Sequence, residues 1–189
     1  LVEQKKQKER DDYYASSAIS GLTDFIGAIE NRWNKDCITS GFSDVDALLD
    51  GGFYPGLYIM GAVSSLGKTT LALQIGDNAA KTGQDVLVFS LEMGKQELIA
   101  KSLSRLSYKR CKGWNTSLEL ATTTRNLLNG NALKTPEQAQ FMNEALKAYA
   151  SYAGRIFYHI GIGDIGVEEV KREIEKHIRI TGKKPLVII

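Results

Sequence analysis

One stretch of sequence decides the fold class: Ala62-Val63-Ser64-Ser65-Leu66-Gly67-Lys68-Thr69-Thr70. It follows an apolar run at 57–60 that predicts a buried strand, and it precedes a periodic pattern that predicts a helix over 68–81. A turn between a strand and a helix that ends in Gly-Lys-Thr is typical of a phosphate-binding loop. The stretch therefore predicts an α/β protein with a phosphate site.

The residue types of this loop suit phosphate chemistry. Successive backbone N–H groups wrap a phosphate, and the following helix adds the positive end of its dipole. We expect Gly67 to allow a close backbone approach, Lys68 to reach the β- and γ-phosphates, and Thr69 to hold Mg²⁺. The expected nucleotide-binding residues are Ala62, Ser64, Ser65, Leu66, Gly67, Lys68, Thr69 and Thr70.

The loop departs from the usual pattern at its first position. GxxxxGK[ST] has glycine where this chain has Ala62, and Gly61 stands one place too early. The alternative interpretation is a Gly-Lys-Thr helix start that holds no ligand.

A carboxylate follows the next predicted strand, 86–89, in Ser90-Leu91-Glu92-Met93. Ligands of α/β sheets bind at the carboxyl ends of the strands. Glu92 is therefore a candidate base that orients and deprotonates the water attacking the γ-phosphate, together with Lys68 as the second catalytic candidate. A solvated or helix-capping glutamate is the alternative.

Strands and helices alternate along the rest of the chain. The patterns predict helices over 95–107, 117–129, 135–151 and 167–180, and strands over 155–160 and 185–189. Such alternation favours a mostly parallel sheet covered by helices on both faces. The 189 residues, 43% of them hydrophobic, suffice for one sizeable core.

The N-terminal region differs from the rest. Residues 1–12 are rich in charge, and apolar residues at three- and four-residue steps predict one amphipathic helix over 13–33. We expect residues 1–36 to form a charged terminus with this helix, and 37–189 to form the α/β domain. The helix either covers its own domain or is a linker that docks on a neighbouring subunit.

Composition narrows the function classes. The formal net charge of +2 gives no electrostatic argument for nucleic acid, and no apolar run approaches the roughly 20 residues of a membrane span. Cys37 and Cys111 have no CxxC partner, so neither zinc nor a disulfide is expected. Without a secretory signal, the expected location is cytoplasmic.

Four motifs together carry a family resemblance: Ile38-Thr39-Ser40-Gly41-Phe42, Gly51-Gly52 with Pro55-Gly56, the phosphate loop, and Phe89-Ser90-Leu91-Glu92-Met93. They resemble the RecA-like ATPase domain of DnaB-type replicative helicases, including those of phages and mobile elements. The resemblance covers about 38–189, and alanine at the start of the loop is common in that family.

The resemblance implies an ATP- and Mg²⁺-binding motor segment that couples hydrolysis to DNA unwinding. It implies single-stranded DNA as a partner of the full-length protein, a homo-hexamer formed through the N-terminal linker helix, and a primase or loader as a further partner. The strand at 185–189 resembles the one that the magnesium-supporting aspartate follows, and we expect that residue, the DNA loops and the arginine finger beyond Ile189. The 189 residues alone should therefore hydrolyse ATP poorly.

Two rival functions stay open. A RadA- or KaiC-like ATPase shares the phosphate loop and the Gly-Gly turn, but Ser-Leu-Glu-Met favours the helicase. A nucleotide-dependent assembly or loader protein would bind ATP without unwinding DNA. The stretch 101–112 is basic; Lys101 and Arg105 are more typical of a solvated helix face than of a DNA contact.

Overall fold

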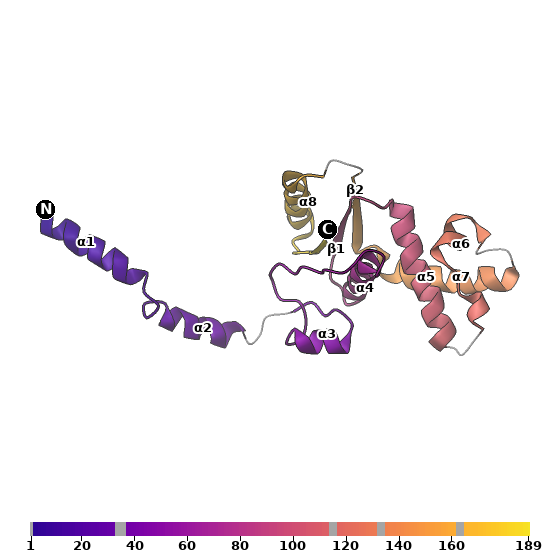
Figure 1. Ribbon diagram of the computed structural model, residues 1–189, viewed down its shortest axis with the longest axis horizontal. Helices are drawn as coiled ribbons and strands as arrows, with labels where there is room; N and C mark the ends of the chain where they lie inside the picture. Colours follow the sequence, from indigo (N-terminus) through magenta and orange to yellow (C-terminus); the bar gives the residue numbers. More distant parts are fainter. Residues whose placement is uncertain (1, 33–36, 114–116, 132–134, 162–164) are drawn as a thin grey trace. The chain divides into compact units, whose positions relative to one another are not determined.

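The computed structural model describes residues 2–32, 37–113, 117–131, 135–161 and 165–189 (Figure 1). The chain divides into two compact units, 1–37 and 38–189. Within the described residues, no helix is long and apolar enough to cross a membrane.

The first unit holds two helices, α1 (Val2–Ala15) and α2 (Leu22–Arg32). The prediction of one helix beginning at residue 13 is wrong, because the serines between the helices bind backbone carbonyls that a continuous helix would use. Ser16 Oγ donates to the Tyr13 carbonyl, and Ser20 Oγ donates to the Ala15 carbonyl. The predicted end at Trp33 lies outside the described residues.

The second unit is built on a parallel sheet in the order β2–β1–β3, with β2 at Ile156–Ile160, β1 at Val86–Ser90 and β3 at Leu186–Ile188. Val86 is opposite Ile156 on one side and Leu186 on the other. Alternate residues of each strand point to opposite faces. Val86, Val88, Ile156 and Tyr158 therefore belong to the main core.

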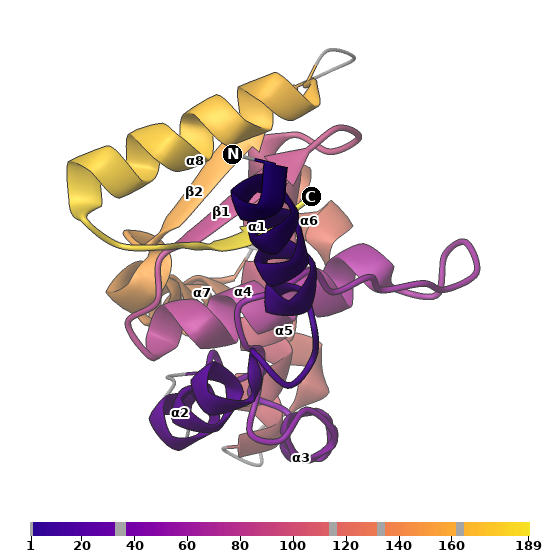
Figure 2. The ribbon, with the colours of Figure 1, turned by 90° about the vertical axis from the view of Figure 1, so that its left-hand side faces the viewer.

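Helices cover both faces of this sheet (Figures 1 and 2). One face packs against α4 (Lys68–Lys81), with α5 (Lys95–Gly113) and α7 (Pro136–Ala153) completing the core behind it. The other face lies under α8 (Val167–Thr181), whose His177 ring meets the Phe157 ring edge to face at 5.0 Å. The predicted α/β architecture with helices on both faces is confirmed.

Helix α4 lies close to the strands because it carries glycine at the contact. A Cβ on Gly76 would stand 3.0 Å from Ile188 Cδ1 and 3.3 Å from Val86 Cγ1. The helix that follows the loop 62–67 thus lies directly on β1 and β3.

Three further predictions need correction. The helix predicted over 117–129 is a 3₁₀ turn (Leu118–Leu120) and a short helix α6 (Thr124–Leu128), each begun by its own side-chain cap. Helix α5 runs six residues past its predicted end. Residues 57–60 form no strand.

Candidate functional site

The stretch 62–70 folds as a tight loop that leads into α4. Ser65 and Gly67 have positive φ angles of 65° and 95°, and Leu66 N–H donates to the Val63 carbonyl at 3.3 Å. Gly67 is the N-cap residue of α4, and its carbonyl accepts from Leu71 N–H. The two positive φ angles turn the chain back on itself immediately before the helix begins.

The lysine of the loop lies across it. Lys68 Nζ donates to the Ala62 carbonyl at 2.8 Å and approaches the Val63 carbonyl at 3.5 Å. An ammonium group held by neutral carbonyl oxygens can exchange them for phosphate oxygens, which bind it more strongly because they are charged. The lysine thus closes the loop on its own carbonyl oxygens.

The start of α4 supplies further donors. The first N–H groups of a helix have no partner within it, and they carry the positive end of the dipole. Lys68, Thr69 and Thr70 occupy this first turn and are exposed. Their backbone N–H groups and the Thr69 hydroxyl fit a phosphate with its Mg²⁺, and a Cβ on Gly67 would meet nothing within 4 Å, so the approach is open.

The segment before the loop is exposed where the sequence predicts a buried strand. Leu57 and Ile59 are 88% and 87% exposed, and Figure 2 shows the chain before α4 extending away from the sheet. The segment instead makes local contacts: Tyr58 OH accepts from Tyr54 N–H at 3.0 Å, and its ring meets that of Phe53 edge to face. A buried strand requires neighbours, and the described sheet ends at β3 without this segment.

A polar clamp holds the segment 38–42 against α4. Asn78 Nδ2 donates to the Ser40 carbonyl at 2.8 Å, and Ser40 is fully buried. Gly41 has φ +76°, and a Cβ there would overlap the side chain of Asn78. Ser40 N–H also donates to Asp46 Oδ1 at 2.7 Å, and hydrogen bonding by the Ser40 side chain, with a smaller contribution from this N–H, lowers the pKa of that carboxyl.

The clamp explains two of the sequence motifs, Ser40-Gly41 and the Gly-Gly turn. Gly52 has φ +149°, and a Cβ on it would stand 2.6 Å from the Ile38 carbonyl, across a two-residue bridge that Ile38 makes with Phe53.

Asn78 was not among the residues predicted from the sequence. The available signal was a polar residue between the inward residues of α4, since half-buried Asn78 lies between buried Asp77 and Ala79.

Glu92 lies in the turn between β1 and α5, at the carboxyl edge of the sheet. Its side chain is exposed and, within the described residues, forms no hydrogen bond and no ion pair. The turn around it is fixed: Ser90 Oγ accepts from Met93 N–H, and Glu97 caps α5 by accepting from Gly94 N–H at 3.0 Å. The helix-capping alternative therefore belongs to Glu97, and Glu92 keeps a free carboxylate.

Arg105 corrects the sequence interpretation of the basic stretch. It is not on a solvated face: its guanidinium donates to the buried Asp77 carboxylate of α4, and its side chain is only 12% exposed. Further along α5, Lys109 and Lys112 are exposed.

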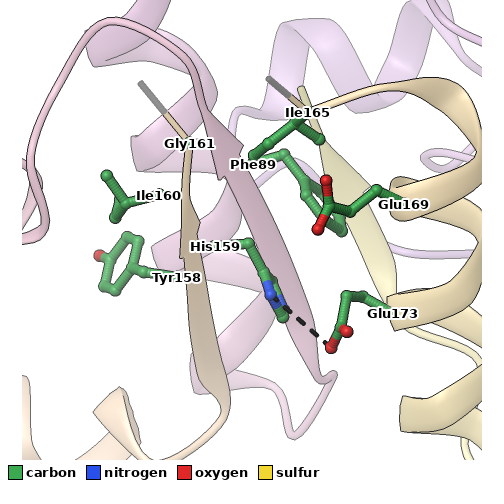
Figure 3. Close-up of a pocket in the computed structure, with 8 residues that line it drawn as sticks. All are labelled: Phe89, Tyr158, His159, Ile160, Gly161, Ile165, Glu169 and Glu173. Carbon is green, nitrogen blue, oxygen red and sulfur yellow. Dashed lines mark ion pairs between the residues drawn. The ribbon is translucent and has the colours of Figure 1, made fainter. Parts of the chain in front are cut away.

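A hollow of about 540 Å³ lies apart from the loop, between the sheet and α8 (Figure 3). The His159 ring stacks on Phe89 with centroids 4.7 Å apart, and its Nδ1 lies 4.0 Å from Glu173 Oε2. Burial lowers the pKa of His159, and the neighbouring Glu173 offsets part of that effect. Among the described residues, no three histidine, cysteine, aspartate or glutamate side chains gather as a metal site would require.

The chain matches the model of a known protein family over more than half of its length. A model described as the DnaB-like helicase C terminal domain matches residues 37–145. This range contains the clamp, the phosphate loop and Glu92.

Curated relatives match over part of their length. Replicative DNA helicase DnaB of Haemophilus influenzae is 35% identical over 85 residues, covering 44% of this chain and 18% of that protein. Replicative DNA helicase DnaB of Geobacillus stearothermophilus is 42% identical over 80 residues, covering 40% and 18%. The chain thus spans about a fifth of the length of these relatives.

Solved structures share the fold. One solved ATPase domain aligns with a TM-score of 0.66 at 18% identity, over 91% of this chain and 55% of that one. A DnaB-like replicative helicase, studied with its primase interactions, aligns with a TM-score of 0.68 at 19% identity, over 91% and 37%. The expected RecA-like fold is therefore confirmed.

Proposed function

Because this chain belongs to the family of DnaB-like helicase C-terminal domains, we propose that it binds ATP with Mg²⁺ and forms part of a replicative helicase motor. The observation that carries the proposal is the loop itself, closed by Lys68 Nζ on the Ala62 carbonyl in a chain of this family. The family match also favours the helicase over the RadA- or KaiC-like alternative.

Each residue has a distinct role in the proposal. The N–H groups of the loop residues Ala62, Ser64, Ser65, Leu66 and Gly67, with those of Lys68, Thr69 and Thr70, surround the phosphates. Lys68 would exchange the carbonyl oxygens for oxygens of the β- and γ-phosphates, and the Thr69 hydroxyl would hold Mg²⁺. Bound Mg²⁺ neutralises phosphate charge. Glu92 accepts the proton of the attacking water.

The partners belong to the full-length protein. We propose single-stranded DNA as the track, a primase or loader as a further partner, and the cytoplasm as the location. A homo-hexamer formed through α2 is supported by that helix's apolar face, on which Leu22, Phe25, Ile26 and Ile29 are each 44% or more exposed. Their spacing places them on one side of the helix, as a docking helix requires.

The test is nucleotide binding to the chain and its Lys68→Ala variant, measured by calorimetry with a non-hydrolysable ATP analogue and Mg²⁺. We expect binding that the variant loses at least tenfold, since one charge-assisted contact to phosphate is worth about 1.5–3 kcal/mol. Lys95→Ala is the matched control, because Lys95 also begins a helix, α5, but follows no phosphate loop. Equal affinity of wild type and Lys68→Ala would refute the phosphate-loop assignment.

Unwinding needs a second assay. Strand displacement by the full-length protein distinguishes a helicase from a nucleotide-dependent assembly or loader protein. ATP-dependent displacement that Lys68→Ala abolishes supports the motor, and ATP-dependent oligomerisation without displacement supports the loader.

A further inference from the structure

A buried ion pair joins the two helices that follow the functional loops. Asp77 lies on α4 and is 1% exposed, and Arg105 on α5 donates from Nη2 to its Oδ2. Removing two charges from water is costly, so a buried pair is a poor source of net stability. The pair therefore calls for an explanation other than stability.

Its position along the helices supplies one. With a rise of 1.5 Å per residue, Asp77 lies about 14 Å along α4 from Lys68, and Arg105 lies about 15 Å along α5 from Lys95. The phosphate loop precedes Lys68, and Glu92 precedes Lys95 by one short turn. The pair thus joins α4 and α5 at similar distances from the phosphate loop and from Glu92, the two groups that must act together in hydrolysis.

Buried tyrosines lie near the pair. Tyr152 of α7 is 4% exposed, and burial together with the nearby Asp77 carboxylate raises its pKa. Tyr149, whose OH lies 3.1 Å from Tyr158 OH of β2, is also near Asp77. Burial raises the pKa of Asp77, and Arg105 beside it offsets part of that effect. In so dry an environment the carboxylate and guanidinium attract strongly and are little screened by salt.

We propose that Asp77 and Arg105 are positioning residues for ATP hydrolysis, which set α5, and Glu92 before it, relative to the phosphate loop on α4. This inference rests on the proposed function. Lys68 and Thr69 stand on α4 itself, so loss of the pair leaves ATP binding intact. Loss of the pair does displace Glu92, and a displacement of a catalytic group by about 1 Å can lower the rate about 10²-fold.

The experiment uses the full-length protein with Asp77→Leu and Arg105→Met combined. Replacing both charges by apolar side chains of similar volume leaves no lone buried charge, so the fold should retain its melting temperature. We expect kcat for ATP to fall at least tenfold per active site, with KM within threefold of wild type. A purely structural role would not separate kcat from KM in this way.

Two further variants complete the design. Arg105→Lys keeps the charge but loses the planar fork of the guanidinium, and it should lower kcat less than the double variant; it decides the question alone if the double variant does not fold. Glu144→Gln is the control, because it removes the Arg110 to Glu144 ion pair, 3.1 Å long, between α5 and α7 without touching α4. It should leave kcat unchanged.

The outcomes separate this inference from the function it rests on. Unchanged kcat in the charge-free variant, or in Arg105→Lys where only that variant folds, overturns the positioning role. So does a rise in KM at constant kcat, or an equal loss in Glu144→Gln. Failure of the proposed function appears differently, as wild-type protein that neither binds nor hydrolyses ATP, or that does both without Lys68.

Discussion

Replacing Gly41 by alanine tests how the segment 38–42 is held on the helix of the phosphate loop. At φ +76° a side chain costs about 1–2 kcal/mol. The new Cβ would also overlap the Asn78 side chain, so the amide must move and leave the buried Ser40 carbonyl without its 2.8 Å hydrogen bond. An unsatisfied buried acceptor costs about 1–3 kcal/mol.

The expected loss is therefore about 2–5 kcal/mol in the free energy of unfolding, measured by urea denaturation of the chain. Gly83→Ala is the matched control: Gly83 has φ +99°, but a Cβ there would meet nothing within 4 Å. It should show the backbone cost alone, about 1–2 kcal/mol.

A double-mutant cycle isolates the contact. Asn78→Ala should cost less in the Gly41→Ala background than in wild type, because the first substitution has already broken the hydrogen bond. If Gly41→Ala destabilises no more than Gly83→Ala, or if the two substitutions are additive, the clamp does not hold the segment as argued.

Three other changes test the site and the fold. Glu92→Gln in the full-length protein should keep ATP affinity and lower turnover by about 10²-fold, measured as phosphate release; unchanged turnover would place the base elsewhere. Thr135→Ala should lower the free energy of unfolding in urea by about 1 kcal/mol, because Thr135 Oγ1 accepts from Gln138 N–H at the start of α7. Thr135→Ser, which keeps the hydroxyl, should lose much less. Because burial lowers the folded pKa of His159 below its unfolded value of about 6.5, the unfolded state takes up the proton first, and the melting temperature should fall as pH drops from about 7 to 5. His159→Asn should reduce that fall, and an identical pH profile would contradict the assignment.

Local patterns predicted the elements whose structure depends on nearby residues. Helix α4 begins at Lys68 and ends at Lys81 as expected, and the helix expected over 135–151 is α7, which Thr135 caps by accepting from Gln138 N–H. Strand β1 is one residue longer than the predicted range 86–89. In each case the apolar period and the capping chemistry lie within the element itself.

Contacts between distant residues were beyond such patterns. The Asn78 to Ser40 bond spans 38 positions and the Arg105 to Asp77 pair spans 28. Both join α4 to another part of the chain, so neither leaves a signal in the local spacing. The density of basic residues predicted a solvated Arg105, whereas in the structure its guanidinium binds the buried Asp77 carboxylate.

The segment 57–60 also shows that local sequence does not specify which neighbours a segment has in the fold. Its composition is that of a buried strand, and the prediction was wrong because burial of a strand depends on neighbours that its own residues do not specify. Tyr58 pairs with Phe53 instead, and the aliphatic side chains beside it remain in solvent.

That exposed run has a practical consequence for biochemistry on the chain. Leu57, Ile59, Val63 and Leu66 are each at least 71% exposed, and the described edge strand β3 is unpaired on one side. Exposed apolar side chains and unpaired strand edges both favour aggregation. Oligomers of the isolated chain in light scattering are therefore not by themselves a sign of a helicase ring. Leu57→Asp combined with Ile59→Asp should disperse aggregates formed through this run, and a ring assembled through α2 should survive the same change.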